Sequence, residues 1–356
     1  MIAFDFTVTE KTTAVNRIID AYFEESIASA GSISESYQQL WKELRSLLNS
    51  GGKRIRPKMT ILSYEAFGGK DYKKILPIAA AQEFLHFSLL IHDDIIDRDY
   101  VRYGTANIAG RYDTHYQPFA RNKQDRLHYA NSAALLGGDL MLSTAYQMIA
   151  TADVPNKDKI IAQTLLGQSI FEVAAGELLD TESAFIPSKS GDALLIARYK
   201  TASYSFLIPL LTGARLAAAS EIQQKNLRVF AIALGIAYQL VDDLLGTFGE
   251  EELTGKSISS DIREGKHTFM TEQCIEHLSS DDRVIFNASF ANPAATPEMI
   301  VRVKELFVAT GAKAATEKAI ASYAAEANNA LQNLELDQSH KDAFEQLINK
   351  VTNRTS

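Results

Sequence analysis

Apolar residues recur at steps of three and four along most of this chain, and no other feature of the sequence constrains its fold as strongly. Ile78, Ala81 and Leu85 follow this spacing, and the ranges 160–179 and 227–245 repeat it. Such steps are the period of a helix with one apolar face, whereas half-buried strands alternate at every second residue. Strand-like alternation is rare here, and the chain has 8 prolines in 356 residues. The pattern predicts an all-α protein.

Short breaks separate the helical segments, and nothing in the sequence divides them into domains. The breaks are expected at 51–52, 68–69, 104–105, 153–156, 187–191, 246–260 and 292–297. No Pro- or Gly-rich linker is visible, and 46% of the residues are apolar, enough to bury a large core. We expect a single helical domain over residues 1–356, with about 297–356 as peripheral C-terminal helices.

Charge and cysteine content exclude some functions and favour one compartment. The formal net charge of −8 makes the chain a poor generic binder of nucleic acid, whose phosphates need clustered Lys and Arg. The single cysteine, Cys274, allows no intrachain disulfide, which fits a reducing compartment. The N-terminus lacks an apolar signal region, and the apolar runs are shorter than the roughly 20 residues of a spanning helix. We expect a cytoplasmic protein with no transmembrane segment.

Two pairs of neighbouring aspartates each end a long apolar helix. Asp93 and Asp94 follow the first helix together with Asp97, which shares a helical face with Asp93. Asp242 and Asp243 end the second. Crowded carboxylates repel one another, and Mg²⁺, which prefers carboxylate oxygens, resolves that repulsion. The alternative is a solvated helix end with a chance acidic run. Two such pairs indicate two helices that face each other across a cavity.

Basic residues accompany the aspartates in several short segments. Lys53, Arg54 and Arg56 follow Gly51-Gly52, where the backbone can approach an anion closely. Lys200 lies in a later helical segment, and Lys256 and Lys266 lie beyond the second aspartate pair. Aspartates with scattered cations suit a diphosphate held by metal ions on one side and by cations on the other. No Walker loop or GxGxxG motif suggests a nucleotide.

In this order and spacing, the motifs between about Asn49 and His267 resemble those of the trans-isoprenyl diphosphate synthases, the polyprenyl synthetase family. The motifs are GGKRIRP at 51–57, HDDIID at 92–97 followed by Arg102 and Gly104, Gly138-Asp139, Lys200-Thr201, QLVDD at 239–243 and the segment 255–268. The resemblance implies the isoprenoid synthase fold, a single large helical bundle with a deep central cavity, usually in a homodimer.

The resemblance also implies the reaction and the residues that carry it. Isopentenyl diphosphate would condense head to tail (1′–4) with dimethylallyl, geranyl or farnesyl diphosphate. Three Mg²⁺ ions are expected on Asp93, Asp97 and Asp242. The residues with catalytic roles would be Asp93, Asp94, Asp97, Asp242, Asp243 and Lys200. The residues that bind the two substrates would be Lys53, Arg56 and His86 for isopentenyl diphosphate, Arg102, Lys200, Lys256 and Lys266 for the allylic diphosphate, and Thr201 and Gln239.

Two positions depart from the family pattern. Tyr103 stands where the family has a second arginine that contacts isopentenyl diphosphate, and Gly246 stands where the second motif has its last aspartate. We interpret both as tuning of an active enzyme. They keep open the alternative of a non-catalytic subunit of a heteromeric synthase. A class I terpene cyclase is a further alternative, although such enzymes typically lack the loop that holds Lys53 and Arg56.

The length of the product depends on the wall below the first aspartates. Bulky aromatic residues four or five positions before Asp93 give short products in the family, and here those positions hold Leu89 and Ser88. Because Ser88 is small, we expect an open wall, with Leu85 as a deeper floor. The sequence therefore predicts a C20 product, as in a geranylgeranyl diphosphate synthase-like member, and Ser88→Phe is expected to shorten it.

Overall fold

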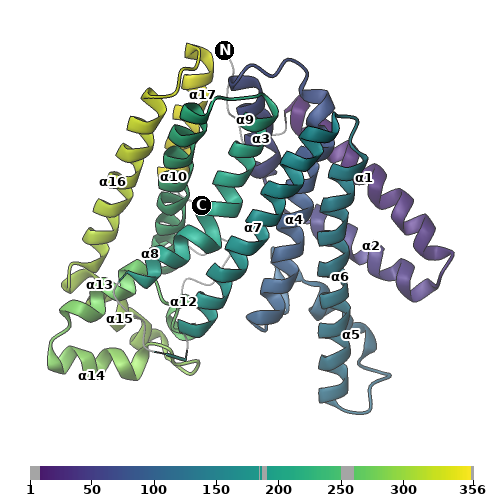
Figure 1. The fold of residues 1–356 in the computed structure, drawn as a ribbon. Coiled ribbons are helices and arrows are strands. Elements are labelled where there is room, and N and C mark those ends of the chain that lie inside the picture. The colour runs from purple at the N-terminus through teal and green to yellow at the C-terminus, as the bar shows by residue number, and fades with distance from the viewer. Residues whose placement is uncertain (1–8, 184, 187–190, 250–259, 354–356) are drawn as a thin grey trace. The chain divides into compact units, whose positions relative to one another are not determined.

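The computed structural model describes residues 9–183, 185–186, 191–249 and 260–353. Figure 1 shows that helices make up nearly all of this part of the chain, so the all-α prediction is confirmed. A small antiparallel hairpin pairs β1 (Val101–Arg102) with β2 (Thr105–Ala106). The sequence predicted a helix break at 246–260, but α10 (Glu221–Phe248) continues through Gly246 and ends two residues later.

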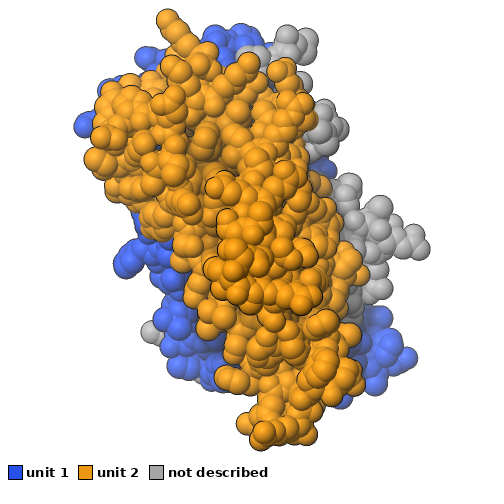
Figure 2. All heavy atoms as spheres, turned by 90° about the vertical axis from the view of Figure 1, so that its right-hand side faces the viewer, with its two compact units in different colours: residues 1–4, 167–211, 219–356 blue, residues 5–166, 212–218 orange. Residues whose placement is uncertain are grey.

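The chain forms two compact units, coloured separately in Figure 2. Unit 2 comprises residues 5–166 and 212–218, and unit 1 comprises residues 1–4, 167–211 and 219–356. The single domain expected from the sequence stays a prediction.

Unit 2 contains the N-terminal helices and the hairpin. Its elements are α1 (Glu10–Gly31), α2 (Glu35–Asn49), α3 (Ile55–Ala66), η1 (Tyr72–Ile75), α4 (Leu76–Ile96), β1, β2, α5 (Ile108–Tyr116), α6 (Lys123–Thr151), the first part of α7 (Asn156–Ser183) and the end of α9 (Ile208–Leu216).

Helix α4 is the core helix of unit 2, and its side chains are buried on more than one face, including Phe84, Leu85 and Phe87. It packs along α6, which lies beside it in Figure 1. Small residues on α6 permit the close approach: a side chain at Gly138 would overlap the imidazole of His92. This packing fixes the end of α4, where the first aspartates lie.

Unit 1 contains the remaining elements. They are the rest of α7, α8 (Asp192–Ile196), the π-helix η2 (Ala197–Leu207), the start of α9, α10, α12 (Ser260–Glu264), α13 (Phe269–His277), α14 (Ser280–Ser289), α15 (Pro297–Ala309), α16 (Ala312–Gln332) and α17 (Gln338–Thr352).

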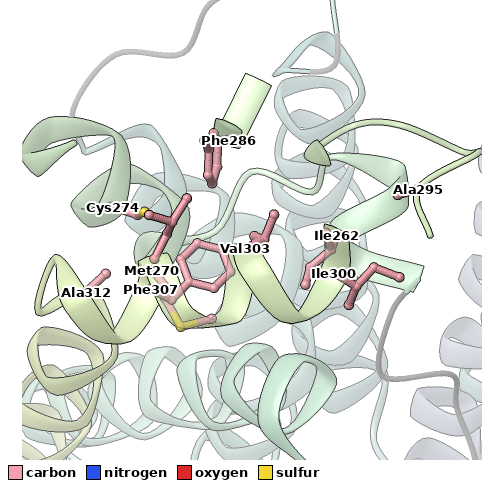
Figure 3. Close-up of a cluster of buried hydrophobic side chains, with 10 residues drawn as sticks. Ile262, Met270, Cys274, Phe286, Ala295, Ile300, Val303, Phe307 and Ala312 are labelled. Atoms are coloured by element: carbon pink, nitrogen blue, oxygen red, sulfur yellow. The ribbon is translucent and has the colours of Figure 1, made fainter. Parts of the chain in front are cut away.

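Helix α10 is the core helix of unit 1 and packs against η2, α16 and α17. Gly235 on α10 lies directly against the backbone of Ala202 on η2, and Phe230 packs edge-on against Phe344 of α17. A second apolar cluster, shown in Figure 3, joins Ile262 of α12 to residues of α13, α14 and α15. Leu244 and Phe248 of α10 pack against this cluster, so α12 is tied to the end of α10.

Two segments, Tyr72–Ile96 and Glu221–Phe248, are long and apolar enough to cross a membrane by length and composition alone. Within their most apolar windows, 72% and 56% of the residues are buried inside the protein. Core helices of globular proteins have the same composition, so these segments do not indicate transmembrane helices.

Candidate active site

The first aspartate cluster lies at the C-terminal end of α4 and is held by an arginine of the hairpin. Arg102 Nε donates a 2.8 Å hydrogen bond to Asp94 Oδ1, and its Nη2 lies 3.1 Å from Asp93 Oδ2. Asp94 is 3% exposed, whereas Asp93 is partly exposed and Asp97 is exposed. Asp93 in the last turn of α4 and Asp97 just after this helix, the two predicted metal ligands here, therefore keep open surface.

Burial controls the charge of Asp94. It raises the pKa of this carboxyl to about 6, although the hydrogen bond and the charge of Arg102 act in the opposite direction. The pKa of Arg102 is raised above its ordinary range despite burial, because Asp94 and Asp93 stabilise its charge. The guanidinium of Arg102 contacts these two aspartates, and its predicted binding of the allylic diphosphate stays a prediction.

The Gly51-Gly52 loop is folded around Arg54, which is 7% exposed. Arg54 Nη1 donates hydrogen bonds of 3.1 Å to Gly51 O and to Glu83 Oε1 on α4. Its Nη2 donates to Leu48 O and its Nε to Asn16 Oδ1. Arg54 thus holds the loop from inside, a role that the sequence did not reveal, because Lys53, Arg54 and Arg56 are similar cations within four residues.

The two predicted substrate cations of this loop, Lys53 and Arg56, are exposed and partly exposed. The imidazole of His86 on α4 is close to the loop. Its pKa lies well below its ordinary value because of burial and, after that, the charges of Arg56, Arg102 and Arg54. The arginines that lower this pKa would also attract an anionic group.

Tyr103 belongs to the same neighbourhood. Its ring lies so close to the loop that a side-chain carbon at Gly51 would be 2.7 Å from the ring. Burial raises the pKa of its hydroxyl, while Arg102 and Arg56 lower it. The residue that replaces a family arginine therefore contacts the predicted isopentenyl diphosphate loop.

The second aspartate pair lies near the end of α10 in unit 1. Asp243 is 6% exposed and its Oδ1 accepts a 2.8 Å hydrogen bond from Gln239 Nε2. Gln239 Oε1 in turn accepts a 2.5 Å hydrogen bond from the hydroxyl of Thr201. Asp242 is partly exposed. The structure thus brings three predicted site residues into one chain of contacts.

Burial raises the pKa of Asp243 to about 7, against the opposing charge of Lys266. Lys266 is itself surrounded by carboxylates, and its pKa is raised above its ordinary range chiefly by Asp261, then by Asp243 and Asp242. Lys256, the other predicted lysine of this segment, lies outside the described residues.

Lys200 lies on the π-helix η2, and the sequence analysis missed its partners. Its Nζ lies 3.0 Å from Glu177 Oε2 and 2.5 Å from Asp180 Oδ2, both on α7. Gly176 allows the close approach, since a side chain there would overlap the backbone of Lys200. The sequence held one signal for these partners: Glu177 and Asp180 are two acids, three residues apart, at the end of a predicted apolar helix.

The donor set fits magnesium. Asp93, Asp97 and Asp242 offer carboxylate oxygens with open surface, and Mg²⁺ prefers oxygen ligands together with water and substrate phosphates. Asp94 and Asp243 are buried and hydrogen-bonded to Arg102 and Gln239. The expectation that α4 and α10 face each other stays a prediction.

The wall residues of α4 differ from the expectation. Ser88 is 1% exposed, so its side chain is packed inside the protein, and its hydroxyl has no hydrogen-bond partner among the residues that the structure describes. Leu89, one helical turn before Asp93, is partly exposed. Leu89 rather than Ser88 therefore presents open surface on the face that carries Asp93.

Comparison with known proteins identifies the family of this chain. The sequence profile of the polyprenyl synthetase family matches residues 37–307. The chain is 31% identical over 290 residues to geranylgeranyl diphosphate synthase of Sulfolobus acidocaldarius, covering 79% of this chain and 82% of that protein. It is 27% identical over 315 residues to geranylfarnesyl diphosphate synthase of Aeropyrum pernix, covering 86% and 92%.

A solved structure is similar over the whole chain. The geranylgeranyl pyrophosphate synthase of Corynebacterium glutamicum, complexed with isoprenyl diphosphate and magnesium, has a TM-score of 0.90 at 27% identity, covering 99% and 100% of the two chains. This chain belongs to the polyprenyl synthetase family. It is a trans-prenyltransferase, an enzyme that condenses isopentenyl diphosphate head to tail with an allylic diphosphate.

Proposed function

We propose that this enzyme is a magnesium-dependent synthase of a C20 prenyl diphosphate. One observation carries the site assignment: each aspartate pair has a partly exposed first member and a buried, hydrogen-bonded second member. Asp93 and Asp242 are the open members, and Asp94 and Asp243 are the buried ones. The open aspartates and Asp97 would hold Mg²⁺, with three ions expected from the family, while the buried aspartates orient the helix ends.

The residues of unit 2 suit the binding of isopentenyl diphosphate. Lys53 and Arg56 offer positive charge beside Gly51-Gly52, and the imidazole of His86, which burial and the arginines keep neutral in the ligand-free protein, offers a hydrogen bond. Arg102 would hold Asp93 and Asp94 in place and reach the allylic diphosphate from that position. Its two contacts with the aspartates support the first of these roles.

In unit 1, Lys200 and Lys266 would stabilise negative charge that develops on the leaving diphosphate. Bound magnesium would supply Lewis-acid stabilisation of the same charge. Thr201 and Gln239 fix the position of Asp243, and thereby of the end of α10. Loss of diphosphate leaves an allylic cation, which the alkene of isopentenyl diphosphate attacks. The proton released at the end is taken by the departed diphosphate.

The C20 product is proposed for two reasons: relatives that make C20 and C25 products resemble this chain, and α4 carries no aromatic residue four or five positions before Asp93. Leu89 is the side chain that would set the first limit on chain growth. The allylic primer would be dimethylallyl, geranyl or farnesyl diphosphate.

Incubation of the purified protein with isopentenyl diphosphate, farnesyl diphosphate and Mg²⁺ tests the proposal. We expect a C20 product, and loss of turnover when EDTA is added. Asp93→Ala and Asp242→Ala should each lower the turnover number roughly a thousandfold or more, several kcal/mol of barrier, while the far-UV circular dichroism stays unchanged. Near-normal turnover in either folded variant contradicts the assignment of the metal ligands.

Assembly and location are further parts of the proposal. We propose a homodimer, which is supported by large apolar side chains exposed on α6 and α7, among them Leu136 (58%), Phe171 (79%) and Leu178 (70%). We propose a cytoplasmic location, which is supported by the single free cysteine, Cys274. Light scattering of the purified chain, with Leu136→Glu as a variant that should dissociate it, tests the dimer.

A further inference from the structure

The helical segment that carries Lys200 begins after a residue that has no side chain. Helix α8 continues directly into η2, so residues 192–207 form one helical segment. The residue before it is Gly191, with a φ of 96°, and a glycine cannot cap the first backbone N–H groups of a helix as Ser, Thr or Asp does. Glu272 of α13, which is 9% exposed, does so instead: its carboxylate oxygens accept hydrogen bonds of 3.1 Å from Gly191 N and 2.7 Å from Ala193 N. A carboxylate from a distant helix therefore holds the start of this segment.

The same carboxylate also holds the segment that carries Lys266. Glu272 Oε1 lies 2.8 Å from Nε2 of His267, the residue that follows Lys266 in the chain. The hydroxyl of Thr271, also on α13, donates a 3.2 Å hydrogen bond to Lys266 O. Burial would raise the pKa of the Glu272 carboxyl, but the contact with His267 and the two backbone N–H groups together lower it below its ordinary value. Glu272 is therefore ionised at neutral pH and accepts from all three groups.

The charge of a single carboxylate acts on both lysines. The Nζ of Lys200 lies 2.5 Å from Asp180 Oδ2. The pKa of Lys266 is raised chiefly by the charge of Asp261, and Asp180 is one of the further carboxylates that raise it. Asp180 therefore stabilises both ammonium groups, although the segments that carry them are far apart in the sequence. These two segments are joined where both contact Glu272.

Helix α13 itself is fixed by apolar packing. Met270 and Cys274, which lie two residues before and two residues after Glu272, are buried in the apolar cluster of Figure 3. Residues two apart project from different faces of a helix, so Glu272 extends toward α8 and away from this cluster. Because the cluster prevents α13 from turning, Glu272 is a fixed point to which both lysine-bearing segments are attached.

We propose that Glu272 is a positioning residue of this enzyme, which holds Lys200 and Lys266 at the separation that lets both ammonium groups stabilise one leaving diphosphate. In this role Glu272 touches no substrate and acts only through the two segments. Cations that are already in place stabilise developing charge without having to move during the reaction, so their fixed separation affects the rate. The inference rests on the proposed function, since that function assigns the two lysines to the leaving diphosphate.

Kinetics of Glu272→Gln with isopentenyl diphosphate, farnesyl diphosphate and Mg²⁺ test the proposal. Glutamine keeps the size of the side chain, but its amide nitrogen cannot accept a hydrogen bond. The turnover number should fall roughly 10- to 100-fold, the loss expected when a charged group is misplaced by about 1 Å. The KM for isopentenyl diphosphate should change less than about twofold, because the residues proposed to bind it belong to unit 2. Glu276→Gln, the same change at an exposed position of α13, is the matched control and should leave both values unchanged.

Binding of inorganic pyrophosphate in the presence of Mg²⁺, measured by isothermal titration calorimetry, gives a readout without turnover. Glu272→Gln should weaken this binding about tenfold, the effect of one charge-assisted hydrogen bond that is no longer well placed. Circular dichroism and thermal midpoints check the fold, since loss of a helix cap by itself lowers stability.

Double variants separate positioning from a structural role. In Lys266→Met one of the two ammonium groups is already absent, so Glu272→Gln can act only through Lys200. The factor by which it lowers the turnover number should then be at least about threefold smaller than in the wild type. His267→Ala leaves the cap of α8 intact and should lower the turnover number in the wild type but not in Lys266→Met. This variant also takes the place of Glu272→Gln if the latter does not fold.

Normal turnover in folded Glu272→Gln, or the same fold loss with and without Lys266, overturns the inference and leaves Glu272 as a structural cap of α8. The single variants Lys200→Met and Lys266→Met separate this result from failure of the proposed function. If each of them lowers the turnover number while Glu272→Gln does not, only the inference about Glu272 fails. If both turn over normally, the assignment of the lysines to the leaving diphosphate is wrong, and the inference fails with it.

Discussion

Replacement of Arg54 by methionine should unfold the isopentenyl diphosphate loop without touching a substrate contact. Arg54 and Glu83 are 7% and 2% exposed, and their side chains meet at 3.1 Å. Removing one partner of a buried ion pair leaves the other charge uncompensated and costs about 3–5 kcal/mol. Arg54→Met also removes the donors to Gly51 O and Leu48 O. We therefore expect a loss near the upper end of this range.

Equilibrium unfolding in urea, followed by far-UV circular dichroism, measures this loss. A second variant, Arg54→Met with Glu83→Gln, removes the unpaired charge as well. Its loss of unfolding free energy should be smaller than the summed losses of the two single variants. The difference should be roughly 0.5–3 kcal/mol, the usual coupling between residues in contact. Lys53→Met is the matched control: Lys53 is exposed, so its stability change should stay within about 0.5 kcal/mol.

Kinetics complete the comparison. Lys53→Met should raise the KM for isopentenyl diphosphate more than the KM for the allylic substrate, with the fold intact. The reasoning is refuted if Arg54→Met loses less than about 1 kcal/mol of stability and raises the KM for isopentenyl diphosphate as Lys53→Met does. Arg54 would then be a substrate residue and not the internal support of the loop.

Three further predictions concern the same unit. Leu89→Phe should shorten the product from C20 to C15 on chromatography of the dephosphorylated product, whereas Ser88→Phe, at a buried position, should mainly lower stability; the reverse result restores Ser88 as the wall. Because the pKa of His86 is lowered by burial and three arginines, the unfolded chain takes up its proton first as the pH falls below about 6.5. This histidine therefore makes stability fall with falling pH, and His86→Gln should reduce the difference between urea midpoints at pH 7.5 and 5.5; an unchanged difference contradicts the lowered pKa. Gly51→Ala should raise the KM for isopentenyl diphosphate severalfold, since the new methyl group would lie 2.7 Å from the Tyr103 ring. Adding Tyr103→Ala should relieve that effect, and no relief means that the ring is not the cause.

Helix content, the aspartate pairs and the basic loop were predictable because each depends on residues close together in the chain. The three-to-four residue spacing identified α4 and α10, and the acids at their ends followed from the sequence directly. The continuation of α10 through Gly246 was not predictable, because a glycine normally favours a helix end.

Tertiary packing decided which of several similar neighbours faces inward. Sequence spacing made Arg54 and Arg56 equivalent cations, yet Arg54 is buried against Glu83 and Arg56 is partly exposed. In the same way, Ser88 is buried while Leu89 is partly exposed.

Contacts between residues that are distant in the chain could also not be predicted from the sequence. The pairing of Lys200 with Glu177 and the position of Asp261 beside Gly246 each join separate elements. Local sequence sets the period of a helix and the chemistry that it carries. The direction of each side chain toward a particular neighbour is set by how the helices pack, because close packing leaves each one a single place to fit.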